Sequence, residues 1–121
     1  MSQFYPHLEV ERRPNACCVR LRTHRIAEKE IHEVVEELVA LARSEGCRNL
    51  VLSLGPKSPE CLYSVFLAKL CWAQRILGEE GRVLVLCDVD PMVRSIFEAC
   101  RLDEQFRFAE DFDEAVAVMA K

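Results

Sequence analysis

Two short apolar runs on either side of a stretch with helical spacing constrain the fold of this chain more than any other feature. Residues 50–54 and 83–86 are almost continuously apolar, which is typical of strands covered on both faces. Over residues 62–77, apolar side chains recur every three or four positions, which predicts an amphipathic helix. Strands joined by a helix pair in parallel through a right-handed crossover. We therefore expect a strand–helix–strand–helix unit over residues 50–100.

The N-terminal part of the sequence predicts a hairpin and a helix. Apolar and charged side chains alternate on both sides of the turn formers Pro14 and Asn15, so residues 8–22 predict two antiparallel strands. Helical spacing then begins at Glu28. We expect Gly46 to cap the C-terminal end of this helix.

Three further helix starts carry capping residues. Ser58 and Asp90 each precede a proline, which suits the first position of a helix because it lacks an amide hydrogen. Asp111 with Glu114 is typical of a capping box. A short edge strand is expected over residues 106–108, before the last helix.

The predicted order of elements indicates an α/β fold with one mixed sheet. We expect four to five strands and about four helices, with the N-terminal hairpin as the antiparallel part. The chain has 121 residues, of which 50% are hydrophobic, so it can bury a core without disulfides or metals. No repeat or linker indicates a second unit, and we expect residues 1–121 to form a single domain.

Charge and hydropathy narrow the function classes. The formal net charge of -4 argues against nucleic acid as a partner, because phosphate binding needs a concentrated basic surface. Apolar runs are too short to span a bilayer, and the N-terminal residues do not resemble a secretory leader. We therefore expect a cytoplasmic protein without direct membrane insertion.

The seven cysteines show no CxxC pair, and most lie in apolar segments. Cysteine in such places behaves as a small hydrophobic residue. We expect buried reduced thiols, and neither a metal nor another cofactor.

Four segments carry a resemblance to a known family. They are 50–54, 81–87, 89–94 and 101–106, with the sequences LVLSL, GRVLVLC, VDPMVR and RLDEQF. Together they resemble the STAS domain family, which includes bacterial anti-sigma factor antagonists and domains attached to sulfate transporters. The similarity extends from the first hairpin to the helix that contains Glu114.

The resemblance implies a STAS-like fold and a non-enzymatic regulatory module. Such antagonists act in partner-switching systems: they bind an anti-sigma factor that is a serine protein kinase, and lose that binding when a serine at the start of the second helix is phosphorylated. A phosphate at that position adds about two negative charges where the helix amides and a docked partner meet. The resemblance leaves the oligomeric state open.

The chain departs from the family pattern at the regulatory serine. The family strand commonly ends in an acidic residue where this chain has Ser53, and the Asp-Ser-Ser-Gly-like run has no counterpart. Ser64 matches a neighbour of the usual phosphoacceptor in one alignment register, but a helix from Pro59 would place it more than a turn inside. Ser58 is the other candidate phosphosite. An N-cap role for Ser58 and a helix-surface hydroxyl at Ser64 are the simpler interpretations, so we expect the switch to be displaced or lost.

Three function classes remain open. The first is a regulatory module that binds an anti-sigma factor or serine protein kinase. The second is an accessory STAS subunit of a membrane transport complex. The third is a small thiol enzyme that uses Cys61, although no Cys-x5-Arg loop follows this residue. For the first two classes, the expected contact surface is the loop after the first buried strand and the outward face of the next helix, with the partner-binding residues Lys57, Ser58, Glu60, Tyr63, Ser64, Lys69 and Trp72.

Overall fold

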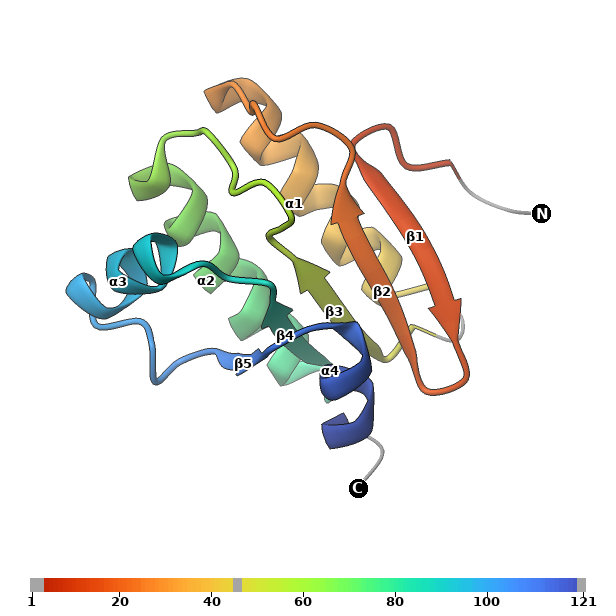
Figure 1. Ribbon diagram of the computed structural model, residues 1–121. Helices are drawn as coiled ribbons and strands as arrows, with labels where there is room; N and C mark the ends of the chain where they lie inside the picture. Colours follow the sequence, from red (N-terminus) through yellow and green to blue (C-terminus); the bar gives the residue numbers. More distant parts are fainter. Residues whose placement is uncertain (1–3, 45–46, 120–121) are drawn as a thin grey trace.

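The computed structural model describes residues 4–44 and 47–119, which form one five-stranded sheet and four helices (Figure 1). The elements in chain order are β1 (Leu8–Arg13), β2 (Ala16–Leu21), α1 (Glu28–Ala42), β3 (Asn49–Ser53), α2 (Tyr63–Glu79), β4 (Val83–Cys87), α3 (Pro91–Ala99), β5 (Arg107–Ala109) and α4 (Phe112–Met119). The prediction of an α/β fold with a mixed sheet is confirmed.

The strands lie in the sheet in the order in which they occur in the chain. β1 and β2 pair antiparallel, and β2, β3, β4 and β5 pair in parallel. Each parallel step contains a helix, as expected for strands that must return to the same edge before pairing. In the register of β3 with β4, Ser53 lies beside Cys87, so the loops that follow these two strands leave the sheet together.

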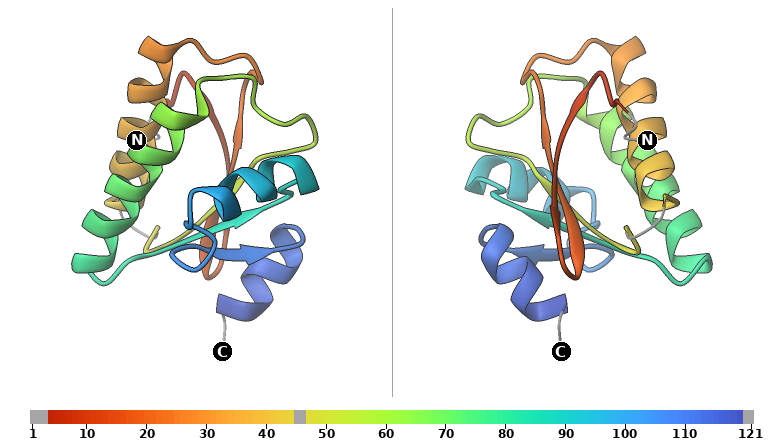
Figure 2. Two further views of the ribbon diagram at one scale, coloured as in Figure 1. Left: turned by 90° about the vertical axis from the view of Figure 1, so that its left-hand side faces the viewer. Right: turned by 90° about the vertical axis from the view of Figure 1, so that its right-hand side faces the viewer.

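The two faces of the sheet are covered differently. α1 and α2 lie on one face and α4 on the other (Figure 2). The larger core contains Val19, Leu50 and Leu52 from the strands and Phe97 from α3. On the α4 side, Phe112 packs in a smaller cluster with strand residues. Both faces of the sheet are covered, which agrees with the almost continuously apolar sequences of β3 and β4.

The prediction that the second long helix begins at Pro59 is wrong, because α2 begins at Tyr63. The segment before it is held extended by the chain at residues 24–26. The Glu60 amide donates to the His24 carbonyl at 2.6 Å, and the Ile26 amide donates to the Glu60 carbonyl at 3.0 Å. These long-range bonds take up backbone groups that a helical turn would otherwise use.

The predicted cap at Asp90 is confirmed, whereas the predicted capping box of Asp111 with Glu114 forms only in part. Asp90 caps α3 and accepts from the Val93 amide at 2.8 Å. Asp111 accepts from the Glu114 amide at 2.9 Å, whereas the Glu114 carboxylate accepts from the Glu110 amide and so does not close a capping box. The C-cap predicted at Gly46 lies outside the described residues.

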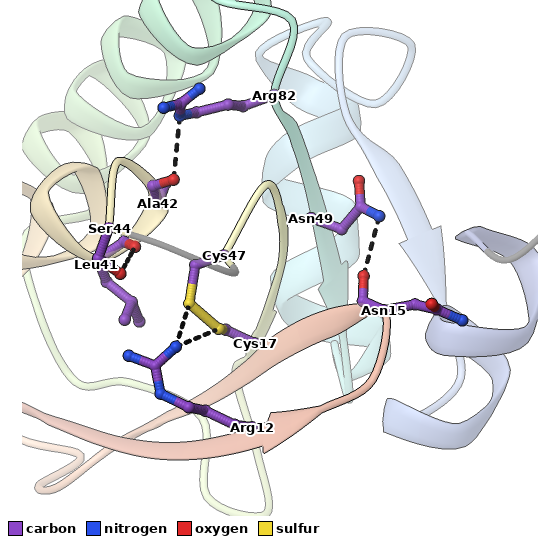
Figure 3. Close-up of a disulfide and its surroundings, with 9 residues drawn as sticks. All are labelled: Arg12, Asn15, Cys17, Leu41, Ala42, Ser44, Cys47, Asn49 and Arg82. Atoms are coloured by element: carbon purple, nitrogen blue, oxygen red, sulfur yellow. Dashed lines mark hydrogen bonds between the residues drawn. A yellow bond between two sulfur atoms is a disulfide. The ribbon is translucent and has the colours of Figure 1, made fainter. Parts of the chain in front are cut away.

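The expectation of reduced cysteines is wrong for one pair. Cys17 on β2 and Cys47, just before β3, form a disulfide with their Cα atoms 5.4 Å apart (Figure 3). The parallel register explains their proximity, since Cys17 lies opposite Leu50, three residues beyond Cys47. No spacing motif indicates this bond, because 30 positions and a whole helix separate the two cysteines. The other cysteines are free.

Candidate functional site

The candidate site begins where β3 and β4 end. The Ser53 hydroxyl donates to Asp88 Oδ2 at 2.5 Å and accepts from the Gly55 amide at 3.2 Å. A Cβ on Gly55 would lie 2.8 Å from the Asp88 Cβ, so the two loops touch at a position that only glycine fits. Asp88 has a φ of 55°, in the left-handed region. The Ser53–Asp88 hydrogen bond and the close contact of Gly55 with Asp88 hold the loop after β3 against the loop after β4.

The Ser53–Asp88 hydrogen bond explains one departure from the STAS pattern. Ser53 occupies the position where the family commonly has an acid, and it is buried. Asp88, at the end of the neighbouring strand, brings a carboxylate to the same place. A second carboxylate at position 53 would face the Asp88 carboxylate, and two like charges are costly in a buried place.

The candidate phosphosite Ser58 has a structural partner. Its hydroxyl donates to Asp90 Oδ2, while Asp90 Oδ1 accepts from the Val93 amide. The hydrogen bond from Ser58, followed by that from the Val93 amide, lowers the pKa of Asp90. Ser58 therefore joins the 55–62 loop to the start of α3, and it does not cap α2.

Ser64 lies in a different place from the one expected. Because α2 begins at Tyr63, Ser64 is the second residue of the helix, and it is exposed. Leu62 precedes the helix and offers no side-chain cap. The prediction that Ser64 lies more than a turn inside the helix, which argued against it as a phosphosite, is therefore wrong.

The remaining predicted contact residues divide between the loop and the middle of α2. Lys57 and Glu60 are exposed on the loop, and Glu60 pairs with Arg25 at 3.4 Å. The Tyr63 hydroxyl donates to the Pro59 carbonyl at 2.6 Å, and burial raises its pKa to about 12. Tyr63 therefore braces the loop.

Lys69 and Trp72 form a second group. The Lys69 ammonium lies over the Trp72 ring, 5.6 Å from its centre, and Trp72 is 38% exposed. Trp72 borders a hollow of about 480 Å³ together with Arg75 and Gln105. Lys69 lies about 9 Å and Trp72 about 14 Å along α2 from the start of the helix, so the predicted residues form two neighbouring patches.

Three residues at this end of the sheet were not among the predicted contact residues. Asp88, Arg94 and Phe108 line a hollow of about 450 Å³ beside Gly55. The Arg94 guanidinium stacks on the Phe108 ring, 3.8 Å from its centre. Asp88 directly follows a buried strand, so the general rule that ligand-binding residues follow parallel strands would have pointed to it. No local motif marks Arg94 or Phe108.

The geometry disfavours thiol chemistry at this end of the sheet. Burial raises the pKa of the Cys61 thiol to about 11 and that of Cys87 to about 12. Few of these thiols are ionised at neutral pH, whereas nucleophilic cysteines have a lowered pKa. Across residues 4–44 and 47–119, no three acidic, histidine or cysteine side chains are grouped to hold a metal ion.

The sheet order, the antiparallel first strand and the helix pair on one face define the STAS-domain fold, which confirms the fold implied by the resemblance. The described helices are all too short or too polar to cross a membrane.

Solved structures share this fold. An anti-sigma-factor antagonist (STAS) domain protein from Planctomyces limnophilus aligns with a TM-score of 0.79 and 20% identity over 94% of this chain and 98% of its own. The Bacillus cell fate determinant SpoIIAA, in its phosphorylated form, aligns at 0.60 with 12% identity over 92% and 97%. A sulfate transporter family protein from Wolinella succinogenes aligns at 0.65 with 15% identity over 85% and 83%. At such identities the likeness shows the fold, and no family model or curated protein matches the sequence.

Proposed function

We propose that this chain is a non-enzymatic regulatory module, similar to the anti-sigma factor antagonists, that binds a protein partner through the 55–62 loop and the outward face of α2. The observation that carries the proposal is the arrangement at this end of the sheet. An exposed serine, Ser64, lies in the first turn of α2, directly after a loop that is held in place by hydrogen bonds of Ser58 and Tyr63. The proposed partner is an anti-sigma factor or a serine protein kinase.

Trp72 is the proposed anchor of the contact. Tryptophan is enriched among the residues that dominate binding energy, because it buries a large area with few rotatable bonds. It is partly exposed here, and Lys69 covers part of its ring. A partner that displaces water from the ring would gain apolar contact, and the Lys69 ammonium would favour an acidic neighbour on that partner.

Ser64 is the proposed phosphorylation site, displaced relative to the family pattern. It is exposed in the first turn of α2, where a phosphate meets free helix amides and any docked protein. Ser58 is a weaker candidate because its hydroxyl is bonded to the Asp90 carboxylate. A phosphate there would face this carboxylate and disturb the start of α3.

Replacing Ser64 by glutamate tests this assignment. We expect Ser64→Glu to fold normally and to bind the partner at least about tenfold more weakly, because a charge enters the contact surface. The partner is captured from the native host and titrated against both proteins. Ser95→Glu is the matched control, since Ser95 is exposed on α3 and bonds only locally, to the Met92 carbonyl at 2.6 Å. Equal binding by Ser64→Glu and wild type would contradict the assignment.

A role as accessory STAS subunit of a membrane transport complex is the second candidate. It is favoured by the structural likeness to the sulfate transporter family protein. The same capture experiment separates the two functions, because a transporter component would replace the regulatory kinase among the bound proteins.

A further inference from the structure

The Cys17–Cys47 disulfide lies at the opposite end of β2 and β3 from the proposed contact surface. Both cysteines are almost fully buried, at 1% and 0% exposure. Arg12 of β1 reaches over them (Figure 3): its Nη1 lies 3.1 Å from Cys47 Sγ and 3.6 Å from Cys17 Sγ. A guanidinium thus contacts both sulfur atoms of the bond.

The placement of Arg12 follows from the strand register. Arg12 pairs with Cys17 in the β1–β2 ladder, so both side chains leave the sheet on the same face. The long side chain then extends past Cys17 to the sulfur of Cys47. An arginine gains little from a neutral disulfide, but it stabilises a thiolate strongly through charge and hydrogen bonding.

Three buried or half-buried free thiols have a different environment. Burial raises the pKa of Cys18 and Cys71, and it raises the pKa of Cys61 to about 11. These thiols stay protonated at neutral pH and exchange slowly. The disulfide pair, by contrast, has a guanidinium in contact with both of its sulfur atoms.

We propose that Cys17–Cys47 is a reversible redox link, opened and closed by thiol–disulfide exchange with dithiols, and that Arg12 favours its opening by stabilising the Cys47 thiolate.

The exchange takes two steps. A thiolate of the dithiol attacks Cys17 Sγ, the S–S bond breaks, and its electron pair leaves on Cys47 Sγ, to which Arg12 donates. The second thiol of the reductant, as its thiolate, then attacks the reductant's own sulfur in the mixed disulfide. This closes the oxidised dithiol and releases the Cys17 thiolate, which takes up a proton. Two electrons pass to the protein, and oxidation reverses the sequence. Both sulfur atoms are buried, so each step requires a local opening of the structure. We expect β1 to move in this opening, because it is the edge strand that carries Arg12.

Two hydrogen bonds near the disulfide join the neighbouring elements independently of the S–S bond. Arg82 Nε donates to the Ala42 carbonyl at 3.0 Å, which holds the end of α1 to the start of β4. The side-chain Nδ2 of Asn49 donates to the Asn15 backbone carbonyl at 2.9 Å, which holds β3 to the hairpin turn. After reduction, these two bonds would still join α1 to β4 and β3 to the hairpin turn.

Equilibration with reduced and oxidised dithiothreitol tests the link. The folded protein is incubated over a range of dithiothreitol ratios and quenched by alkylation, and the Cys17–Cys47 peptide is quantified by mass spectrometry. We expect reversible titration of this pair. The equilibrium constant for reduction should fall about tenfold in Arg12→Leu and Arg12→Gln, because a stabilised thiolate loses its cation. Arg12→Lys should restore most of it, and Arg107→Leu, an exposed arginine on β5, should not change it.

Two results would overturn the proposal. A pair that stays fully oxidised or fully reduced at every dithiothreitol ratio, while the protein is folded, is not a reversible link. Equal equilibrium constants for wild type, Arg12→Leu and Arg12→Gln would remove the role of Arg12. Circular dichroism of each variant confirms the fold, and Arg12→Lys provides the comparison if either neutral variant unfolds.

Discussion

Replacing Ser53 by aspartate, the residue type expected there from the STAS pattern, should destabilise this protein by about 3–4 kcal/mol at neutral pH, equivalent to a carboxyl pKa raised by two to three units. The introduced carboxyl would be buried and within reach of the Asp88 carboxylate, which now accepts from Ser53 at 2.5 Å. Burial and the neighbouring charge both raise its pKa. The defect should therefore shrink as the pH falls, because the protonated carboxyl can again donate to Asp88. Urea unfolding at pH 7 and pH 5 measures both effects.

Two variants separate charge from size in this experiment. Ser53→Asn adds similar bulk without charge and should cost clearly less than Ser53→Asp. Adding Asp88→Asn to Ser53→Asp should recover most of the loss, because asparagine donates to the new carboxylate and tolerates the φ of 55°. If Ser53→Asp were as stable as wild type, or if the second substitution gave no rescue, the view that Asp88 replaces the missing acid would be wrong.

Removing the disulfide should have an effect of similar size. The Cys17→Ala/Cys47→Ala protein should lose about 3–4 kcal/mol of unfolding free energy, because a loop spanning 30 positions is no longer closed in the unfolded chain. Chemical denaturation under non-reducing conditions gives the value. Cys100→Ser, at an exposed free cysteine, is the control and should stay within about 0.5 kcal/mol of wild type. An unchanged denaturation midpoint in the double variant would contradict a stabilising bond.

The fold could be predicted from the sequence because its strongest signals are local. The continuous apolar runs of β3 and β4 and the Asp90-Pro91 start of α3 each indicate their structure without distant contacts. The start of α2 could not be predicted in this way. Ser58 and Pro59 look like a helix start, but long-range bonds between Glu60 and the chain at residues 24–26 keep the segment extended.

The site was only partly predictable for the same reason. The place of the loop after β3 follows from the strand end, and helical spacing puts Trp72 off the main apolar stripe of the helix without deciding how far it is exposed. The Ser53–Asp88 bond depends on the pairing of two strands, and the disulfide depends on the register of β2 with β3. These two contacts join residues 30 or more positions apart in the sequence. No local sequence pattern around any of these residues predicts them.

Quantitative capture of partners by wild type and Trp72→Ala tests most directly the claim that α2 carries a protein-binding surface. Tagged proteins are used to isolate partners from the native host, and the captured protein is then titrated. Val118→Ala is the matched control, because Val118 is a large exposed apolar residue on α4, across the sheet from α2. We predict about thirtyfold weaker binding for Trp72→Ala, as for a residue that contributes about 2 kcal/mol, and unchanged binding for Val118→Ala. Full binding by Trp72→Ala, or loss of binding only in Val118→Ala, would contradict the account.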